Sequence, residues 1–298
     1  MKERQVPRNK MTFSQAEGIE PVPEPMALGQ LSEDLRISLW NLTYEKLRKS
    51  ISKHPRFNHV YLINPWYQIL YDHHVFSLHK SADEFSNMFS TNAEITKSLF
   101  IKGAFNKVLD FLEFVFRHRS CPSGFSYTIE EALRQHKCSY TITLIEGIPT
   151  IVPITLPEQA ESFKKDFHML ESGPFGGARS HLRTSATYIN NGDFAGSIRE
   201  SIHAVESIAR CLSPNGATSL KAALKILSGK GVTLHPALEQ GIIKFYGYTS
   251  DQDGIRHAML ENQTSDVNEE EAVFMFGACV SFSAYLVSKA RKVGLFSG

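Results

Sequence analysis

Apolar residues in the first part of the chain recur at helical spacing. Leu35 and Leu39 lie one turn apart, and Ser32 stands just before them. A serine in that position accepts a hydrogen bond from a free amide of the first turn, so the pattern predicts a helix that begins directly after Ser32. The same criterion predicts two more helices, over residues 82–89 and 104–117.

Residues 140–155 have a different pattern, which is typical of two extended strands. Tyr-Thr-Ile-Thr-Leu-Ile precedes the pair Glu146-Gly147, and Ile-Pro-Thr-Ile-Val-Pro-Ile follows it. A two-residue connection that ends in glycine favours a tight hairpin turn. Pro149 and Pro153 lack an amide hydrogen, so they confine the second strand to the edge of a sheet.

The second half of the chain is helical throughout. A helix is predicted over residues 193–212, because its apolar residues form one stripe at steps of four and three: Ile198, Ile202, Val205, Ala209 and Leu212. Residues 272–288 are uncharged, but they are fewer than the roughly 20 strongly apolar residues of a membrane span. We therefore predict a buried helix there and no membrane contact.

These elements predict two domains. The first is an α+β domain with a small β-hairpin or sheet, over residues 11–157. The segment Gly-Pro-Phe-Gly-Gly at residues 173–177 interrupts the pattern, so residues 158–176 are predicted to be a linker that includes a charged helix. The second is an all-α helical bundle over residues 177–293.

The charge of the chain excludes one class of function. The 298 residues carry 32 basic and 31 acidic side chains, and residues 174–298 alone carry 12 and 11. Tight, non-specific binding of nucleic acid requires a strong positive excess, which neither half has. Any nucleic acid must therefore be held locally, by a few residues or by a symmetric pair of chains.

The cysteines and histidines predict neither a metal nor a cofactor. The four cysteines are scattered, without a Cys-x-x-Cys pair, which suits a reducing cytoplasm. The histidines, including His73 and His74, show no consistent ligand spacing, and there is no phosphate-binding glycine motif. We expect a cytoplasmic protein, since the first residues also lack the apolar core of a signal peptide.

One pair of residues is a candidate for phosphate chemistry. Arg256 and His257 are adjacent at a predicted helix start, shortly after Asp253. Arginine presents a planar cation that fits phosphate, and histidine can exchange a proton near neutral pH. Together they suit metal-independent RNA cleavage. The alternative is structural: Arg256 pairs with Asp253 or Glu206, and His257 packs.

A polar stripe lies beside the apolar stripe of residues 193–212. Its members share one helical face at steps of four, three and four: Arg199, His203, Glu206 and Arg210. If two helices meet there, Glu206 can orient Arg256 or His257, and the cations can support RNA. The alternative is a solvated face held by local ion pairs, each worth only tenths of a kcal/mol.

Several separated segments together resemble AbiJ-type abortive-infection proteins. The amino-terminal segments resemble the AbiJ amino-terminal domain, and they are 11–19, 35–41 and 151–154. The later segments resemble the HEPN domain that follows it, and they are 175–182, 197–206, 220–224, 246–251, 254–258 and 271–286. The resemblance covers nearly the whole chain from Met11.

The resemblance implies a phage-defence protein whose HEPN domain is an endoribonuclease, usually a dimer with both copies lining one cleft. HEPN nucleases are similar in carrying an arginine followed four to six residues later by a histidine, whereas Arg256 and His257 are adjacent. The implied catalytic residues are Arg256, His257 and Glu206, and the supporting or RNA-binding residues are Arg199, His203, Arg210 and Asp253.

Three hypotheses on function stay open at this point. In the first, the chain is a ribonuclease whose amino-terminal domain senses a phage trigger or a defence-system protein. In the second, the HEPN-like domain is a non-catalytic module that dimerises and binds RNA, nucleotide or another defence protein. The first is the leading hypothesis, and the near-zero charge of each half and the missing motif spacing support the second as its alternative. A third and weaker hypothesis is a toxin that the product of a neighbouring gene neutralises.

Overall fold

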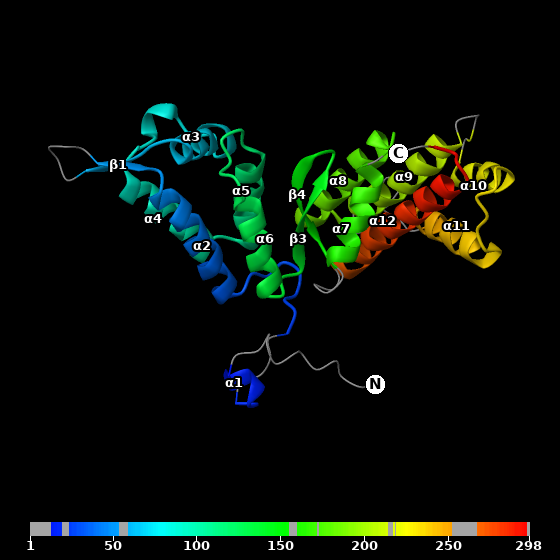
Figure 1. Ribbon diagram of the computed structural model, residues 1–298, viewed down its shortest axis with the longest axis horizontal. Helices are drawn as coiled ribbons and strands as arrows, with labels where there is room; N and C mark the ends of the chain where they lie inside the picture. Colours follow the sequence, from blue (N-terminus) through cyan, green and yellow to red (C-terminus); the bar gives the residue numbers. More distant parts are fainter. Residues whose placement is uncertain are drawn as a thin grey trace, which may run out of the picture.

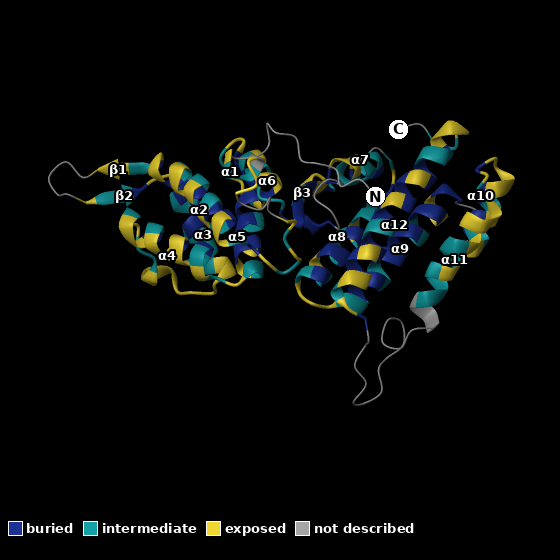
Figure 2. Ribbon diagram, turned by 90° about the horizontal axis from the view of Figure 1, so that it is seen from below, coloured by how far each residue is buried: buried dark blue, intermediate teal, exposed yellow. Residues whose placement is uncertain are grey.

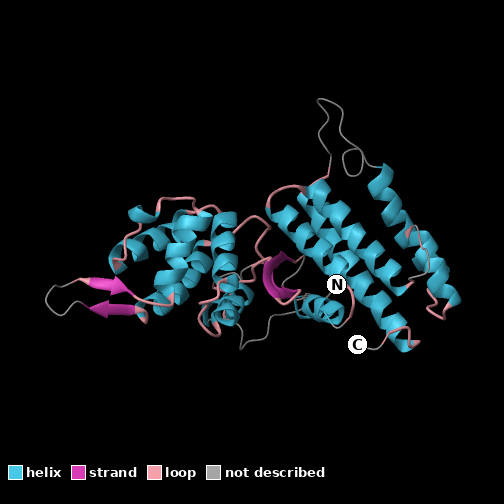
Figure 3. Cartoon of the chain, turned by 90° about the horizontal axis from the view of Figure 1, so that it is seen from above, coloured by secondary structure: helices cyan, strands magenta, loops and turns pink. Residues whose placement is uncertain are grey.

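The computed structural model describes residues 13–19, 24–53, 59–154, 160–171, 173–213, 217, 219–251 and 267–296. The described chain is mostly helical and contains two small antiparallel sheets of two strands each (Figure 3). The elements form two groups side by side, and one of the two β-hairpins lies between them (Figure 1). The α+β prediction for the first half and the all-helical prediction for the second are both confirmed at this level.

The first group is built from helices around a core rich in aromatic residues. Helix α1 (Phe13–Ala16) lies apart from both groups in Figure 1. The elements of the first group are α2 (Glu33–Arg48), β1 (Ile51–Lys53), β2 (Val60–Leu62), α3 (Trp66–Asp72), a π-helical turn (His73–Ser77), a 3₁₀ turn (Ala82–Glu84), α4 (Phe89–Lys102), α5 (Phe105–Arg117) and α6 (Phe125–Gln135). Trp66 and Phe125 pack edge to face at this core, with ring centroids 5.7 Å apart. Ser32 caps α2 as predicted, accepting from the Leu35 amide at 3.3 Å.

The helix predicted over residues 82–89 is wrong. Residues Ala82–Glu84 form a single 3₁₀ turn, and the long helix α4 begins only at Phe89. Ser86 explains the boundary, because its carbonyl oxygen accepts from the Asn92 side-chain amide at 2.7 Å and holds the chain outside the helix. Local polar bonds of this kind compete with helix formation in a way that apolar spacing does not reveal.

His73 gives the first group an acid-sensitive position. Its ring packs between Phe111 and Phe114, at centroid distances of 5.0 and 5.2 Å. Burial, with a smaller effect of neighbouring His74, lowers the pKa of His73 to about 4 from an ordinary value of 6.5. The folded state therefore disfavours the charged ring, so stability is full above pH 6.5 and falls as the pH drops from 6.5 toward 4.

We expect His73→Leu to remove the fall in the stability of the first group between pH 6.5 and pH 4. The shift of the His73 pKa corresponds to at most about 3 kcal/mol, which we reduce to about 1–2 kcal/mol because the residue is only partly buried. Trp40 and Trp66 are the two tryptophans of the chain, and both lie in the first group, so their fluorescence in urea follows its unfolding. Equal acid sensitivity in the wild type and in His73→Leu would contradict the prediction, and His168→Leu is the control.

The second hairpin joins the two groups because both of its faces are buried. It consists of β3 (Tyr140–Ile145) and β4 (Ile148–Pro153), and Glu146 and Gly147 adopt positive φ angles of 56° and 70° in the turn. Tyr140 and Ile151 belong to the core of the first group, whereas Ile145 and Val152 belong to the core of the second. The sheet is therefore a layer shared by two cores.

Carboxylates from the surrounding helices close the open edges of this hairpin. Ile142 and Ile151 face each other across the two strands, and their amides point outward. The Ile142 amide donates to Glu130 of α6 at 2.7 Å, and the Ile151 amide donates to Glu113 of α5 at 2.5 Å. Burial raises the pKa of Glu113, an effect that neighbouring Arg117 opposes. Both strands of a two-stranded sheet are edge strands, and these two carboxylates accept hydrogen bonds from amides that would otherwise have no partner in the sheet.

The second group is a bundle of helices. They are α7 (Ala160–Glu171), α8 (Gly176–Asn190), α9 (Phe194–Leu212), α10 (Leu220–Gly229), α11 (Pro236–Asp251) and α12 (Glu269–Lys292). Buried residues face inward along α8, α9 and α12, and exposed residues cover the outside (Figure 2). The apolar stripe predicted on α9 is buried in full. Helix α7 lies in the predicted linker, and its Phe167 and Leu170 belong to this core.

Helix α12 is the described helix that is long and apolar enough to cross a membrane by length and composition. It carries a capping box, in which the Asn268 side chain and the Glu271 carboxylate each accept from the other's backbone amide. Most of its apolar window is buried inside the bundle, against α7, α8 and α9. A core helix passes the same composition test, and the burial of α12 agrees with the predicted buried helix.

Three serines join α8 to α9 in the interior. The Ser185 hydroxyl lies 2.9 Å from the Ser197 hydroxyl and 2.8 Å from the Ser201 hydroxyl, and all three residues are fully buried. We expect Ser185→Ala to destabilise the second group by about 1–3 kcal/mol, because it leaves two buried hydroxyls with fewer partners. Thermal unfolding followed by circular dichroism measures the change. Ser228→Ala, at the exposed end of α10, is the control, and equal melting temperatures for the two variants would contradict the prediction.

Candidate functional site

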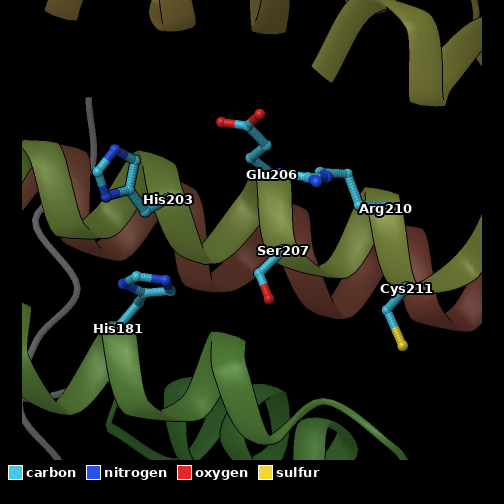
Figure 4. Close-up of a pocket in the computed structure, with 6 residues that line it drawn as sticks. All are labelled: His181, His203, Glu206, Ser207, Arg210 and Cys211. Carbon is cyan, nitrogen blue, oxygen red and sulfur yellow. The ribbon is translucent and has the colours of Figure 1, made fainter. Parts of the chain in front are cut away.

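A pocket of about 490 Å³ opens between α8 and α9. Its lining residues are mostly polar or ionisable, and they are His181, His203, Glu206, Ser207, Arg210 and Cys211. All but His181 come from α9, where steps of three, one, three and one place them on a single face. Figure 4 shows the two imidazole rings at one end of the pocket, with Arg210 and Cys211 at the other.

The antiparallel pairing of α8 and α9 brings the two histidines together. His181 and His203 each lie eleven residues from Gly192, which has a positive φ angle of 79° in the turn between the helices. Residues at equal distances from such a turn face each other when the helices run antiparallel. The ring centroids are 5.4 Å apart and the ring planes cross at 67°.

Glu200 lies between the two imidazoles. Its Oε2 atom is 2.6 Å from Nδ1 of His181, and its Oε1 atom is 3.7 Å from Nδ1 of His203. The carboxylate is 17% exposed, whereas the His181 and His203 side chains are 37% and 33% exposed. Glu200 is thus hydrogen-bonded to the His181 ring and lies near the His203 ring, and both rings remain partly open to solvent. Such an arrangement suits proton transfer or metal binding.

The other end of the pocket carries the positive charge. Arg210 is exposed, and its guanidinium is directed along α9 toward Glu206 (Figure 4). Two helical turns, about 10 Å, separate Arg210 from His203 along the helix axis. In Figure 4 the Arg210 side chain extends toward His203, so its guanidinium lies closer to the imidazoles than the helix spacing alone would place it. A bound anionic group can therefore contact the guanidinium while another part of the same ligand contacts the imidazoles.

Cys211 does not supply a nucleophile in this pocket. Its sulfur contacts the carbonyl oxygen of Pro174 at 3.3 Å, so the thiol donates a weak hydrogen bond. Partial burial raises the pKa of the Cys211 thiol, which keeps it protonated at neutral pH. Reactive cysteines require the opposite shift.

The structure brings together only part of the predicted site. His203, Glu206 and Arg210 line the pocket as members of the predicted polar stripe, whereas Arg199 is not among the lining residues. Arg256, His257 and Asp253 lie outside the described residues. Their proposed catalytic roles therefore stay predictions.

Sequence analysis missed His181 and Glu200. Each belongs to a segment that resembles a HEPN domain, but neither stands in the polar stripe of α9. Two features of the sequence point to this cluster. Glu200 and His203 have a Glu-x-x-His spacing on one helix, and His181 stands as far before Gly192 as His203 stands after it. The cluster can be predicted only if the antiparallel register of α8 and α9 is known, and the spacing of residues on a single helix does not give that register.

Comparison with known proteins identifies the class of the chain from its first half. The family described as AbiJ N-terminal domain 4 matches residues 11–168, more than half of the chain. The protein belongs to this AbiJ family, as its amino-terminal segments predicted. Membership indicates a role in abortive infection, a form of phage defence.

Comparisons with curated proteins and with solved structures found no relative of the chain. The family match ends within α7, so it does not reach the pocket between α8 and α9. The resemblance of residues 177–293 to a HEPN domain stays a prediction.

Proposed function

We propose that this abortive-infection protein is a cytoplasmic endoribonuclease of the HEPN type, and that it acts as a homodimer through residues 177–293. The observation that carries the proposal is the pair His181 and His203, which share the Glu200 carboxylate in one open pocket with Arg210. The family role in phage defence supports it, because degrading RNA stops an infected cell. In this proposal, residues 11–157 receive a phage signal or bind another defence protein.

The proposed reaction uses the ribose itself as the nucleophile. One imidazole removes the proton from a 2′-hydroxyl, and the oxygen attacks the adjacent phosphorus. The bond to the 5′-oxygen breaks, and the other imidazole gives that oxygen a proton. The products are a 2′,3′-cyclic phosphate and a 5′-hydroxyl end, so neither water nor a cofactor is consumed.

Each pocket residue has a part in this reaction. His181 and His203 carry the protons, and Glu200 positions both rings. Arg210 stabilises the charge that builds up on the phosphate oxygens. Arg256 and His257 remain candidates for the same roles, either in the same chain or from the partner across a dimer cleft, with Glu206 orienting one of them and Asp253 and Arg199 as supporting residues.

The test is RNA cleavage by purified, tag-free protein in excess EDTA. Transfer RNA is the substrate, and the wild type is compared with Arg210→Ala and with Arg256→Ala. We expect products that end in cyclic phosphate, and we expect Arg210→Ala to reduce their rate by at least tenfold. The absence of cleavage by wild type that still binds the RNA would reject the ribonuclease and favour the non-catalytic module.

A further inference from the structure

The cluster of His181, Glu200 and His203 also has the geometry of a metal site. One ligand atom from each residue lies within 4.8 Å of the other two. A tetrahedral ion with ligand bonds of 2.0–2.1 Å places neighbouring ligand atoms about 3.3 Å apart. Nδ1 of His181 lies 2.6 Å from Oε2 of Glu200, and Nδ1 of His203 lies 3.7 Å from Oε1 of the same carboxylate. Rotation of these three partly exposed side chains would bring one ligand atom from each to the tetrahedral spacing.

The fold supplies these ligands from two helices that are already fixed in place. Glu200 and His203 stand three residues apart on α9, so their side chains emerge from the same face. His181 comes from α8, which packs tightly along α9 through the buried serines Ser185, Ser197 and Ser201. The ion would replace the proton that now joins Glu200 to His181, and would link α8 to α9.

The chemistry of the ligands selects the kind of ion. Two imidazole nitrogens and one carboxylate oxygen suit zinc and its neighbours in the first transition row. Calcium and magnesium prefer sites made of oxygen atoms. Three protein ligands leave a fourth position open, and the exposure of both histidines directs that position to the pocket that contains Arg210.

We propose that His181, Glu200 and His203 bind one divalent ion of the zinc class, with an open coordination position that faces the pocket. The sequence predicted no metal, because the ligands come from two segments whose register only the fold reveals. This proposal concerns binding. An ion held by both imidazoles would occupy nitrogens that transfer protons in the proposed reaction, so the metal-bound form is distinct from the metal-free form that is tested for RNA cleavage in EDTA.

Titration of the full-length, tag-free protein with zinc chloride in a calorimeter tests the site. We expect one equivalent to bind the wild type, and His181→Ala, Glu200→Gln and His203→Ala each to weaken binding by at least tenfold. His168→Ala, which removes an exposed histidine from α7, is the matched control and should bind as the wild type does. Circular dichroism shows whether each variant keeps its helices.

Cobalt chloride gives an independent readout. Visible absorption of bound Co²⁺ distinguishes four-coordinate from six-coordinate geometry. We expect the strong bands of the four-coordinate form in the wild type and in His168→Ala, and not in the three ligand variants. A wild type that binds neither ion, or binding that survives in His181→Ala and His203→Ala, would overturn the proposal. Absence of RNA cleavage both in EDTA and with added zinc would reject the proposed function and leave both metal measurements unaffected.

Discussion

Replacing His203 by alanine is expected to lower the rate of RNA cleavage by about 10²–10⁴-fold, the usual contribution of a positioned acid or base. The ring stands in the pocket with His181 and near the Glu200 carboxylate, so its removal leaves one proton transfer without a carrier. The measurement is the initial rate of cyclic-phosphate formation from transfer RNA in excess EDTA.

The double variant His181→Ala/His203→Ala sharpens this prediction. Residues that act as a unit are not additive, so the double variant should lose about as much activity as the single one. His168→Ala should cleave at the wild-type rate, because His168 is exposed on α7, away from the pocket residues. Activity of His203→Ala within twofold of the wild type would place the chemistry elsewhere, with Arg256 and His257 as the next candidates.

The second large effect concerns stability, and it comes from Glu130. This carboxylate accepts from the Thr141 hydroxyl at 2.8 Å and the Ile142 amide at 2.7 Å, and it pairs with Lys164 of α7. It is 14% exposed. We expect Glu130→Ala to lower the free energy of unfolding by about 3 kcal/mol, since two donors and an ammonium group lose a largely buried acceptor.

Its neighbour on α6 is the control. Glu131 is more exposed and pairs with Arg134 in the same helix, so Glu131→Ala should cost less than about 0.5 kcal/mol. Urea unfolding followed by tryptophan fluorescence measures both variants, because Trp40 and Trp66 lie in the first group. Equal midpoints for the two variants would show that the hairpin edge does not depend on Glu130.

Local patterns predicted the elements well where one physical cause dominates. The Glu146-Gly147 turn fixed the register of the hairpin, and the apolar stripe of α9 identified its buried face. The prediction failed at residues 82–89, where side-chain bonds around Ser86 and Asn92 delay the helix. In each case the deciding interaction lies within a few residues of the element.

The site was predictable only in part, for a different reason. His203, Glu206 and Arg210 share one helix, so their spacing is enough to place them on one face. His181 and Glu200 complete the cluster only through the packing of α8 against α9, which depends on long-range contacts. The roles of Arg256 and His257 in phosphate chemistry stay predictions, and the position of Glu200 beside two imidazoles required the tertiary structure.

The hairpin of β3 and β4 has a consequence for how members of this family can exchange parts. On one face of the hairpin, Ile145 and Val152 pack into the core of the second group. On the other face, Tyr140 and Ile151 pack into the core of the first group. Recombination that joins the first group of one protein to the second group of another would meet mismatched surfaces at this sheet. Functional hybrids should therefore arise where both flanking surfaces are inherited together with the strands.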